Sequence, residues 1–247
     1  WPNGCPKRNP FGCIPAPPLR MLPPVPAVAN PRPAVSVEER RHRREARPPG
    51  RNDDCCMEEP SPILSVVLPA YNEAENVAPV THRLCEAMEE LARPFEILWV
   101  NDGSTDDTAD VLEQLCAEDG RIRTLHFSRN FGHMAALCAG LEAARATGAV
   151  ITMDADGQHP PELIAELVAR WDEGADIVQT LRDPATQEGL LKQQTSKGFY
   201  RVLSLLADIE LPAGAADFRL MDRQAVDALN ALPERARFVR GLVHWVG

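Results

Sequence analysis

From residue 63 onward, short runs of apolar residues alternate with longer amphipathic stretches. Apolar runs of about four to eight residues are typical of strands buried on both faces, and apolar positions three or four apart indicate helices. The pattern predicts strands at 63–70, 95–100, 121–127, 149–154 and 175–180, and helices at 74–91, 105–117, 133–146, 161–171 and 189–207. This alternation predicts an α/β fold with a mostly parallel central sheet and helices on both faces.

The first 60 residues follow neither period. Residues 1–62 contain 15 of the 23 prolines, and an arginine-rich run over 38–47 interrupts them. Such a composition cannot bury enough apolar surface to offset the entropy of ordering the chain. We therefore expect residues 1–60 to be a disordered, Pro/Arg-rich segment, followed by a single folded domain over 63–247.

Charge excludes one class of partner. The chain has a formal net charge of −10, and from residue 63 onward 29 acidic residues face only 16 basic ones. An acidic surface repels the phosphate backbone, so we expect no nucleic-acid binding. A metal ion or a few local arginines can still hold a small anionic substrate. The chain also lacks a run of about 18 apolar residues, the length that a membrane-spanning helix needs.

Three of the predicted strands are followed by polar residues. These segments are 69–73, 101–106 and 154–161. Ligands of open parallel sheets bind beyond the carboxyl ends of the strands, so we expect these segments to form one site. Taken singly, Asn72 and Asp106 could cap helices, and the Asp102-Gly103 pair is common in turns.

Capping does not explain Asp154 and Asp156, which lie one residue apart at the end of a buried strand. Strand alternation points both side chains the same way, and two neighbouring carboxylates repel unless a cation lies between them. Hard oxygen ligands suit Mg²⁺ or Mn²⁺, which often share their shell with substrate phosphates. A cation bound together with a diphosphate is therefore the simplest interpretation.

Several segments resemble a known enzyme family. VVLPAYNE (66–73), VNDGSTDDT (100–108) and MDADGQHPPE (153–162) resemble the hallmark segments of family 2 glycosyltransferases, which have the GT-A fold and invert the anomeric carbon. A second set resembles the branch that makes polyprenyl-phosphate sugars, which includes dolichyl-phosphate mannose synthases and bactoprenol glucosyltransferases. This second set comprises SRNFGHMAAL (128–137), the arginine of QTLRD (179–183), DFRLMDR (217–223) and RFVRGLVHWVG (237–247).

The resemblance implies roles for individual residues. The nucleotide-sugar would contact Pro69, Tyr71, Glu73, Asp102, Asp154, Ala155, Gln158, Arg182 and Arg219. Asp102 would accept hydrogen bonds from the base, and the two arginines would lie near the diphosphate or the incoming phosphate. Asp154, Asp156 and Gln158 would hold Mg²⁺ or Mn²⁺, with Asp156 as the more direct ligand and thereby a catalytic residue.

The implied reaction moves a hexose from a nucleotide-diphospho-sugar to a polyprenyl phosphate at the cytoplasmic face of a membrane. UDP-glucose is the favoured donor, because residues 128–247 resemble the bacterial members. GDP-mannose stays open as the donor. A sugar hydroxyl stays open as the acceptor and would require a general base, for which Asp217 is the catalytic candidate. His133 and His159 are weaker candidates, more readily interpreted as structural.

A nucleotide-sugar-binding fragment without turnover is the non-enzyme alternative, and a homo-oligomer also stays open. Bacterial members of the branch usually continue into transmembrane helices, so the resemblance leaves two alternatives open: a membrane part beyond residue 247, or a soluble member of the branch. The stretch 190–209 places Lys192, Lys197 and Arg201 among apolar residues. Core packing is the default interpretation of such a helix, and an interfacial helix on a bilayer is the second.

Overall fold

The computed structural model describes residues 19–21, 61–157, 159–182, 215–232 and 239–246. The predicted helix over 189–207, its alternative as an interfacial helix over 190–209, and the expected ligand Gln158 lie outside these residues. No helix in the described ranges is both long and apolar enough to cross a membrane.

The described strands form one seven-stranded sheet in the order β1-β6-β7-β5-β2-β3-β4. The strands are β1 (Leu19–Met21), β2 (Leu64–Ala70), β3 (Phe95–Asn101), β4 (Ile122–His126), β5 (Ala149–Thr152), β6 (Ile177–Arg182) and β7 (Ala215–Asp222). The helices are α2 (Ala74–Glu90), α3 (Thr108–Glu118), α4 (His133–Ala143), α5 (Ile164–Asp172), α7 (Arg223–Asn230) and α8 (Val239–Val246), with the 3₁₀ turn η1 (Pro161–Leu163) before α5.

Strand directions confirm the predicted sheet. β2 pairs in parallel with β3 and β5, and β3 pairs in parallel with β4. β7 was not predicted, and it inserts antiparallel between β5 and β6. Its sequence, AADFRLMD, contains an ion pair and lacks the continuous apolar run of the other central strands.

The prediction for the N-terminal segment needs a correction at three residues. Leu19–Met21 form β1, which pairs antiparallel with β6 at the sheet edge. A three-residue strand has no detectable alternation and gains its order from the β6 backbone, so the local sequence did not indicate it. The other residues of 1–60 lie outside the described part of the chain.

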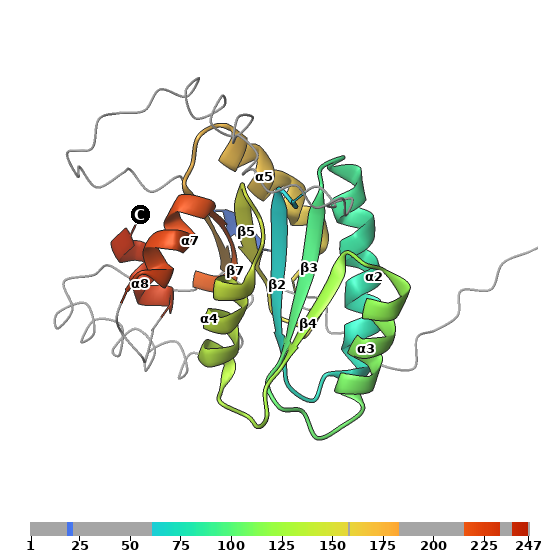
Figure 1. Ribbon diagram of the computed structural model, residues 1–247. Helices are drawn as coiled ribbons and strands as arrows, with labels where there is room; N and C mark the ends of the chain where they lie inside the picture. The colour runs from blue at the N-terminus through green and yellow to red at the C-terminus, as the bar shows by residue number, and fades with distance from the viewer. Residues whose placement is uncertain (1–18, 22–60, 158, 183–214, 233–238, 247) are drawn as a thin grey trace, which may run out of the picture.

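Two apolar cores cover the two faces of the sheet. Alternate residues of β3 separate them, since Trp99 packs into one core and Leu98 into the other. In Figure 1, α2 and α3 lie on one side of the sheet, while α4, α7 and α8 lie on the opposite side. The first core takes its helical residues from α2, α3 and α5, and the second from α4, α7 and α8. Helices on both faces are thus confirmed.

Side-chain contacts explain where α4 ends. The sequence pattern predicts a helix to residue 146, but α4 ends at Ala143. The Glu96 carboxylate accepts the N–H of Arg145 at 2.6 Å, and the Ser65 hydroxyl accepts the N–H of Ala146 at 3.0 Å. These bonds turn the chain toward β5, and periodicity within the helix does not encode them.

Candidate functional site

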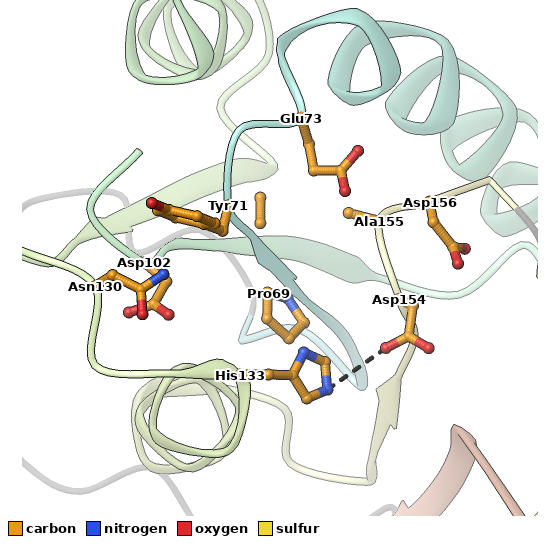
Figure 2. A pocket seen from close by; sticks show the side chains of 10 residues that line it. Pro69, Tyr71, Glu73, Asp102, Asn130, His133, Asp154, Ala155 and Asp156 are labelled. Carbon is orange, nitrogen blue, oxygen red and sulfur yellow. Dashed lines mark ion pairs between the residues drawn. The ribbon is translucent and has the colours of Figure 1, made fainter. Parts of the chain in front are cut away.

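A pocket of about 310 Å³ opens at the carboxyl ends of β2, β3 and β5. It is lined by Pro69, Ala70, Tyr71, Glu73, Asp102, Asn130, His133, Asp154, Ala155 and Asp156, most of which Figure 2 labels. The three strands are parallel, so the polar segments that follow them meet at one edge of the sheet. The predicted convergence of the strand ends is confirmed.

Two loops build the first wall. The N–H of Asn72 donates to the Ser104 hydroxyl at 3.0 Å, and the side-chain oxygen of Asn72 accepts the N–H of Thr105 at 2.8 Å. Asp106 accepts the N–H of Ala74 at 3.3 Å and also an N–H at the start of α3. Helix capping therefore describes only part of the role of Asp106, and Asn72 instead joins the loop after β2 to the loop after β3.

Asp102 connects this wall to the start of α4. Its carboxylate is buried and accepts the backbone N–H groups of Phe131 at 2.7 Å and Gly132 at 2.9 Å. Gly103, at φ +67°, lets the loop approach closely, since a Cβ there would overlap the backbone of Arg129. Asp102 thus positions the segment that brings Asn130 into the pocket. The expected hydrogen bond from a base to Asp102 stays a prediction.

The second wall follows β5. The N–H of Asp154 donates to His159 Nδ1 at 3.2 Å, and the imidazole of His159 is buried and stacks on Phe218. His159 therefore orients the turn that carries Asp154, which agrees with the structural interpretation of this histidine.

Burial raises the pKa of Asp154 above the usual range of an aspartate. His159 and His133 oppose the increase, and the carboxylates of Asp217 and Asp156 add to it. The effect of His159 requires a protonated Nδ1, whereas this nitrogen accepts the Asp154 N–H. Burial and the two neighbouring carboxylates therefore dominate.

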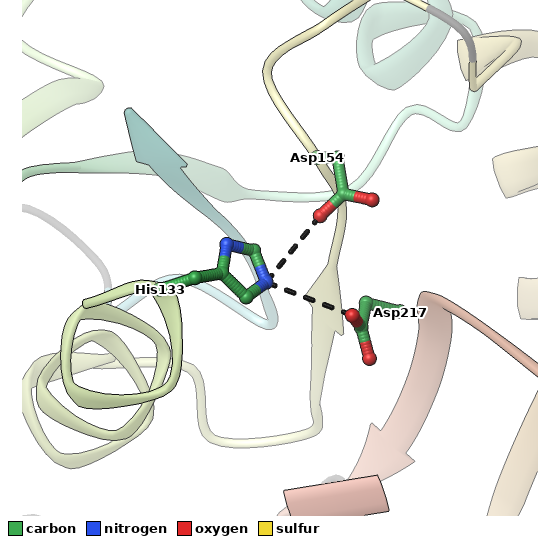
Figure 3. A group of neighbouring side chains, drawn as sticks. All are labelled: His133, Asp154 and Asp217. Atoms are coloured by element: carbon green, nitrogen blue, oxygen red, sulfur yellow. Dashed lines mark ion pairs between the residues drawn. The ribbon is translucent and has the colours of Figure 1, made fainter. Parts of the chain in front are cut away.

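His133, the first residue of α4, points between two carboxylates in Figure 3. Its Nε2 lies 3.5 Å from Asp154 Oδ1 and 3.6 Å from Asp217 Oδ2. The other oxygen of Asp217 accepts a hydrogen bond from Arg219 at 2.8 Å, and both side chains of this ion pair are buried. The ring of His133 thus faces the pocket carboxylates, and its interpretation as a structural histidine stays a prediction.

The predicted site residues fall into three groups. Seven line the pocket: Pro69, Tyr71, Glu73, Asp102, Asp154, Ala155 and Asp156. Asp217 and Arg219 lie on β7, where Asp217 reaches the pocket through His133 and Arg219 lies behind Asp217. Arg182 ends β6, and its side chain is not among the described parts of the chain.

Three lining residues lie outside the predicted nucleotide-sugar and metal site: Ala70, Asn130 and His133, of which His133 was a weaker candidate for a general base. A signal for Asn130 and His133 existed, because the segment 128–137 directly follows the predicted strand over 121–127. This strand end carries no carboxylate, so it was not among the three strand ends expected to form the site.

The donor atoms fit a divalent cation. One oxygen of Asp154, one of Asp217 and a ring nitrogen of His133 all lie within 4.8 Å of one another. Two carboxylates and an imidazole are a common ligand set for divalent ions of the first transition row. The cleft can therefore hold both a cation and an anion that the cation attracts.

A profile of known families settles the membership. The Glycosyl transferase family 2 profile matches residues 65–229, more than half of the chain. The chain belongs to glycosyl transferase family 2. The three segments that resemble the family, 66–73, 100–108 and 153–162, all contribute residues to the lining of the pocket.

Individual relatives agree with this family membership. An uncharacterised glycosyltransferase of Synechocystis is 46% identical over 184 residues, which cover 74% of this chain and 58% of that protein. A bactoprenol glucosyl transferase of Shigella phage SfX is 38% identical over 187 residues, covering 74% of this chain and 60% of that protein. The chain thus spans less than two thirds of the length of these relatives.

Among solved structures, mannosyl-3-phosphoglycerate synthase of Rubrobacter xylanophilus superposes with a TM-score of 0.48 at 23% identity. The match covers 66% of this chain and 54% of that one.

Proposed function

We propose that the protein transfers a hexose, favoured to be glucose, from UDP-hexose to a polyprenyl phosphate, with inversion at the anomeric carbon. The observation that carries the proposal is the pocket between the two loop walls. One wall offers the half-exposed ring of Tyr71 together with Pro69, surfaces suited to a nucleoside. The opposite wall offers Asp154 and Asp156, suited to a cation that binds a diphosphate.

When bound, a divalent cation would neutralise the charge that develops on the departing diphosphate. Asp154, Asp156 and Asp217 are the described carboxylates that can hold it. Asp102 supports the reaction from a distance, because it fixes the loop that presents Asn130. The backbone bond from Asp154 to His159 keeps the acidic wall in place before the donor binds.

The surroundings of Asp217 favour a phosphate acceptor over a sugar hydroxyl. A hydroxyl acceptor needs a general base, and a general base needs an oxygen that readily takes a proton. One oxygen of Asp217 already accepts a bond from the buried Arg219 guanidinium, which stabilises the ionised carboxylate. A polyprenyl phosphate arrives as an anion and needs no such base. The similarity to the bactoprenol glucosyl transferase of Shigella phage SfX supports the same acceptor.

A lipid acceptor also implies where the protein works. Polyprenyl phosphates are held in a bilayer, and sugar nucleotides are found in the cytoplasm. We therefore propose that the domain acts at the cytoplasmic face of a membrane. Its partners there would be the donor, the lipid phosphate and the membrane surface, with no nucleic acid involved.

The test is donor binding followed by transfer. The full chain would be titrated with UDP-glucose and GDP-mannose by calorimetry, with Mn²⁺ and with EDTA. Asp156→Ala is the site variant, and Asp110→Ala on the exposed face of α3 is the matched control. Labelled glucose from UDP-glucose would then be followed into the organic phase with undecaprenyl phosphate as the acceptor.

We expect metal-dependent binding of UDP-glucose that Asp156→Ala abolishes and Asp110→Ala preserves, with label recovered in the lipid. Binding of GDP-mannose alone would replace the glucosyl proposal by a mannosyl one. Transfer to a sugar hydroxyl but not to the lipid phosphate would refute the proposed acceptor.

A further inference from the structure

Three side chains from separate elements meet beside the pocket. His133 begins α4, Asp154 follows β5, and Asp217 lies within β7. The same imidazole nitrogen, Nε2, faces one oxygen of each aspartate at 3.5 and 3.6 Å. Figure 3 shows the two carboxylates on the same side of the ring, both directed toward this nitrogen.

These separations are close to those of a coordination shell. Bonds of about 2.1 Å to an octahedral ion place neighbouring ligand atoms roughly 3 Å apart and opposite ones roughly 4.2 Å apart. The measured distances lie between these two values. The two carboxylate oxygens also lie within 4.8 Å of each other, so small side-chain rotations would bring the three atoms around one ion.

The supports of the triad resemble those of metal ligands. The second oxygen of Asp217 is held by Arg219 at 2.8 Å, and the Asp217 carbonyl accepts the Thr152 hydroxyl at 2.5 Å. Partners of this kind fix the direction in which a ligand presents its coordinating atom. Asp217 is therefore oriented by the sheet itself.

Asp156 differs from these residues. It is exposed and lies in the turn after β5, beyond the last strand residue. An exposed carboxylate on a turn retains its water and loses rotamer freedom when it binds an ion. Asp156 faces the pocket, where the diphosphate of a donor would arrive.

We propose that the donor-free protein binds its divalent cation through His133, Asp154 and Asp217, and that Asp156 joins the shell only when a nucleoside diphosphate is present. The first half of this proposal stands on the triad, and the second half rests on the proposed function. An imidazole in the shell favours Mn²⁺ or Co²⁺ over Mg²⁺, which prefers oxygen ligands.

The competing explanation is that His133 is protonated and no cation is bound. A protonated His133 could satisfy both carboxylates by ion pairing alone. The two explanations differ in whether Mn²⁺ binds before the nucleotide and in which side chain its binding requires.

The experiment measures Mn²⁺ binding to the full chain by electron paramagnetic resonance of the free ion, without nucleotide and then with UDP. Site variants are His133→Ala, Asp217→Asn and Asp156→Ala. The matched control is His82→Ala, which removes an exposed histidine of α2 that lies 3.4 Å from Glu86 and outside the pocket of the candidate site. Thermal melting of each variant checks that it folds. If Asp217→Asn does not fold, the Mn²⁺ affinity of His133→Ala alone tests the triad.

We expect the donor-free Mn²⁺ affinity to fall about tenfold or more in His133→Ala and Asp217→Asn, and by less than about threefold in Asp156→Ala and His82→Ala. With UDP, Asp156→Ala would lose the additional affinity that the wild type gains. Wild-type affinity for Mg²⁺ without UDP would be lower than for Mn²⁺.

Two results would overturn the proposal. One is a wild type that binds no Mn²⁺ until UDP is added, which leaves the triad as an ion pair. The other is donor-free binding that Asp156→Ala abolishes and His133→Ala preserves. Neither result affects the calorimetric test of UDP-glucose binding, so this inference and the proposed function can fail independently.

Discussion

Two carboxylates at opposite ends of the parallel strands, one buried and one partly buried, have opposite surroundings. Glu96 lies at the amino end of β3, where Arg123 donates to one oxygen at 2.7 Å and Ser65 to the other at 2.6 Å. Asp154 lies beyond the carboxyl end of β5, next to the carboxylates of Asp217 and Asp156. Glu96 also accepts the backbone N–H that ends α4.

The difference separates stability from function. Donors surround Glu96, so its burial holds three chain segments together without leaving charge unpaired. Asp154 is partly buried next to two other carboxylates, and burial first and these charges second raise its pKa and make its ionised form costly. A bound cation would relieve this repulsion, so the arrangement of carboxylates favours cation binding. Glu96, at the amino end of its strand, thus stabilises the fold, whereas Asp154, beyond the carboxyl end of its strand, belongs to the candidate functional site.

The largest expected effect is at the carboxyl end. Asp154→Asn removes a charge from the cation site, and we expect turnover to fall by roughly 10³-fold. The melting temperature would stay the same or rise, because an aspartate with a raised pKa lowers folding stability above that pKa. Initial-rate assays and calorimetric melts on the same preparation measure both. A variant that melts much lower would mean that Asp154 supports the fold as Glu96 does.

At the amino end of β3, Glu96→Ala should lower stability and leave turnover unchanged. It leaves Arg123 without its carboxylate and frees the chain after α4, so we expect about 3 kcal/mol lower stability in urea unfolding. Glu113→Ala, on an exposed position of α3, is the control and should change stability by less than about 0.5 kcal/mol. Turnover per folded molecule should match the wild type, and a loss of turnover without a loss of stability would break the comparison.

Asp102 both supports a loop of the fold and lines the pocket, so its substitution should affect stability and UDP affinity to an intermediate extent. Asp102→Asn replaces one of the two oxygens that accept the N–H groups of Phe131 and Gly132. One buried donor is then unsatisfied, which costs about 1–2 kcal/mol of unfolding free energy. UDP affinity should fall as well, because the loop that carries Asn130 loosens. Unchanged stability with lost affinity would point to a direct contact with the base instead.

The smallest effect is expected at a paired carboxylate on the surface. Hydrogen bonding from Arg121 lowers the pKa of Asp119, so its stabilising effect is present above the unfolded pKa of about 3.9 and is lost as pH falls through the folded pKa. Asp119→Asn should lower stability by less than about 1 kcal/mol at pH 7. Urea midpoints of the two proteins should converge below about pH 3. A constant difference across this range would exclude ionisation as the cause.

Local pattern predicted much of this molecule correctly. Strands β2 to β6 and helices α2 to α5 follow from runs and periods within single segments, and the site motifs lie where those strands end. β7 was missed because Asp217 and Arg219 make it look polar, and their burial is possible only because they pair with each other.

Contacts between distant segments were beyond the local pattern. Ser65, Arg123 and Arg145 surround Glu96 from positions 27 to 49 residues away. The spacing of apolar residues along the chain does not indicate such a network. The partners of His133 on β5 and β7 were hidden for the same reason, although the segment that contains it follows a predicted strand.

The sequence by itself determined the alternation of strands β2 to β6 with helices α2 to α5, the presence of helices on both faces, and the polar segments at the strand ends. Backbone preferences and apolar spacing act over a few residues, so they can be read locally. Only the tertiary structure decided that His133, Asp154 and Asp217 share one point, and that Asp102 supports the loop before α4. Hydrogen bonds and ion coordination act over a few ångströms, and only the folded sheet brings residues so far apart in the chain within that range.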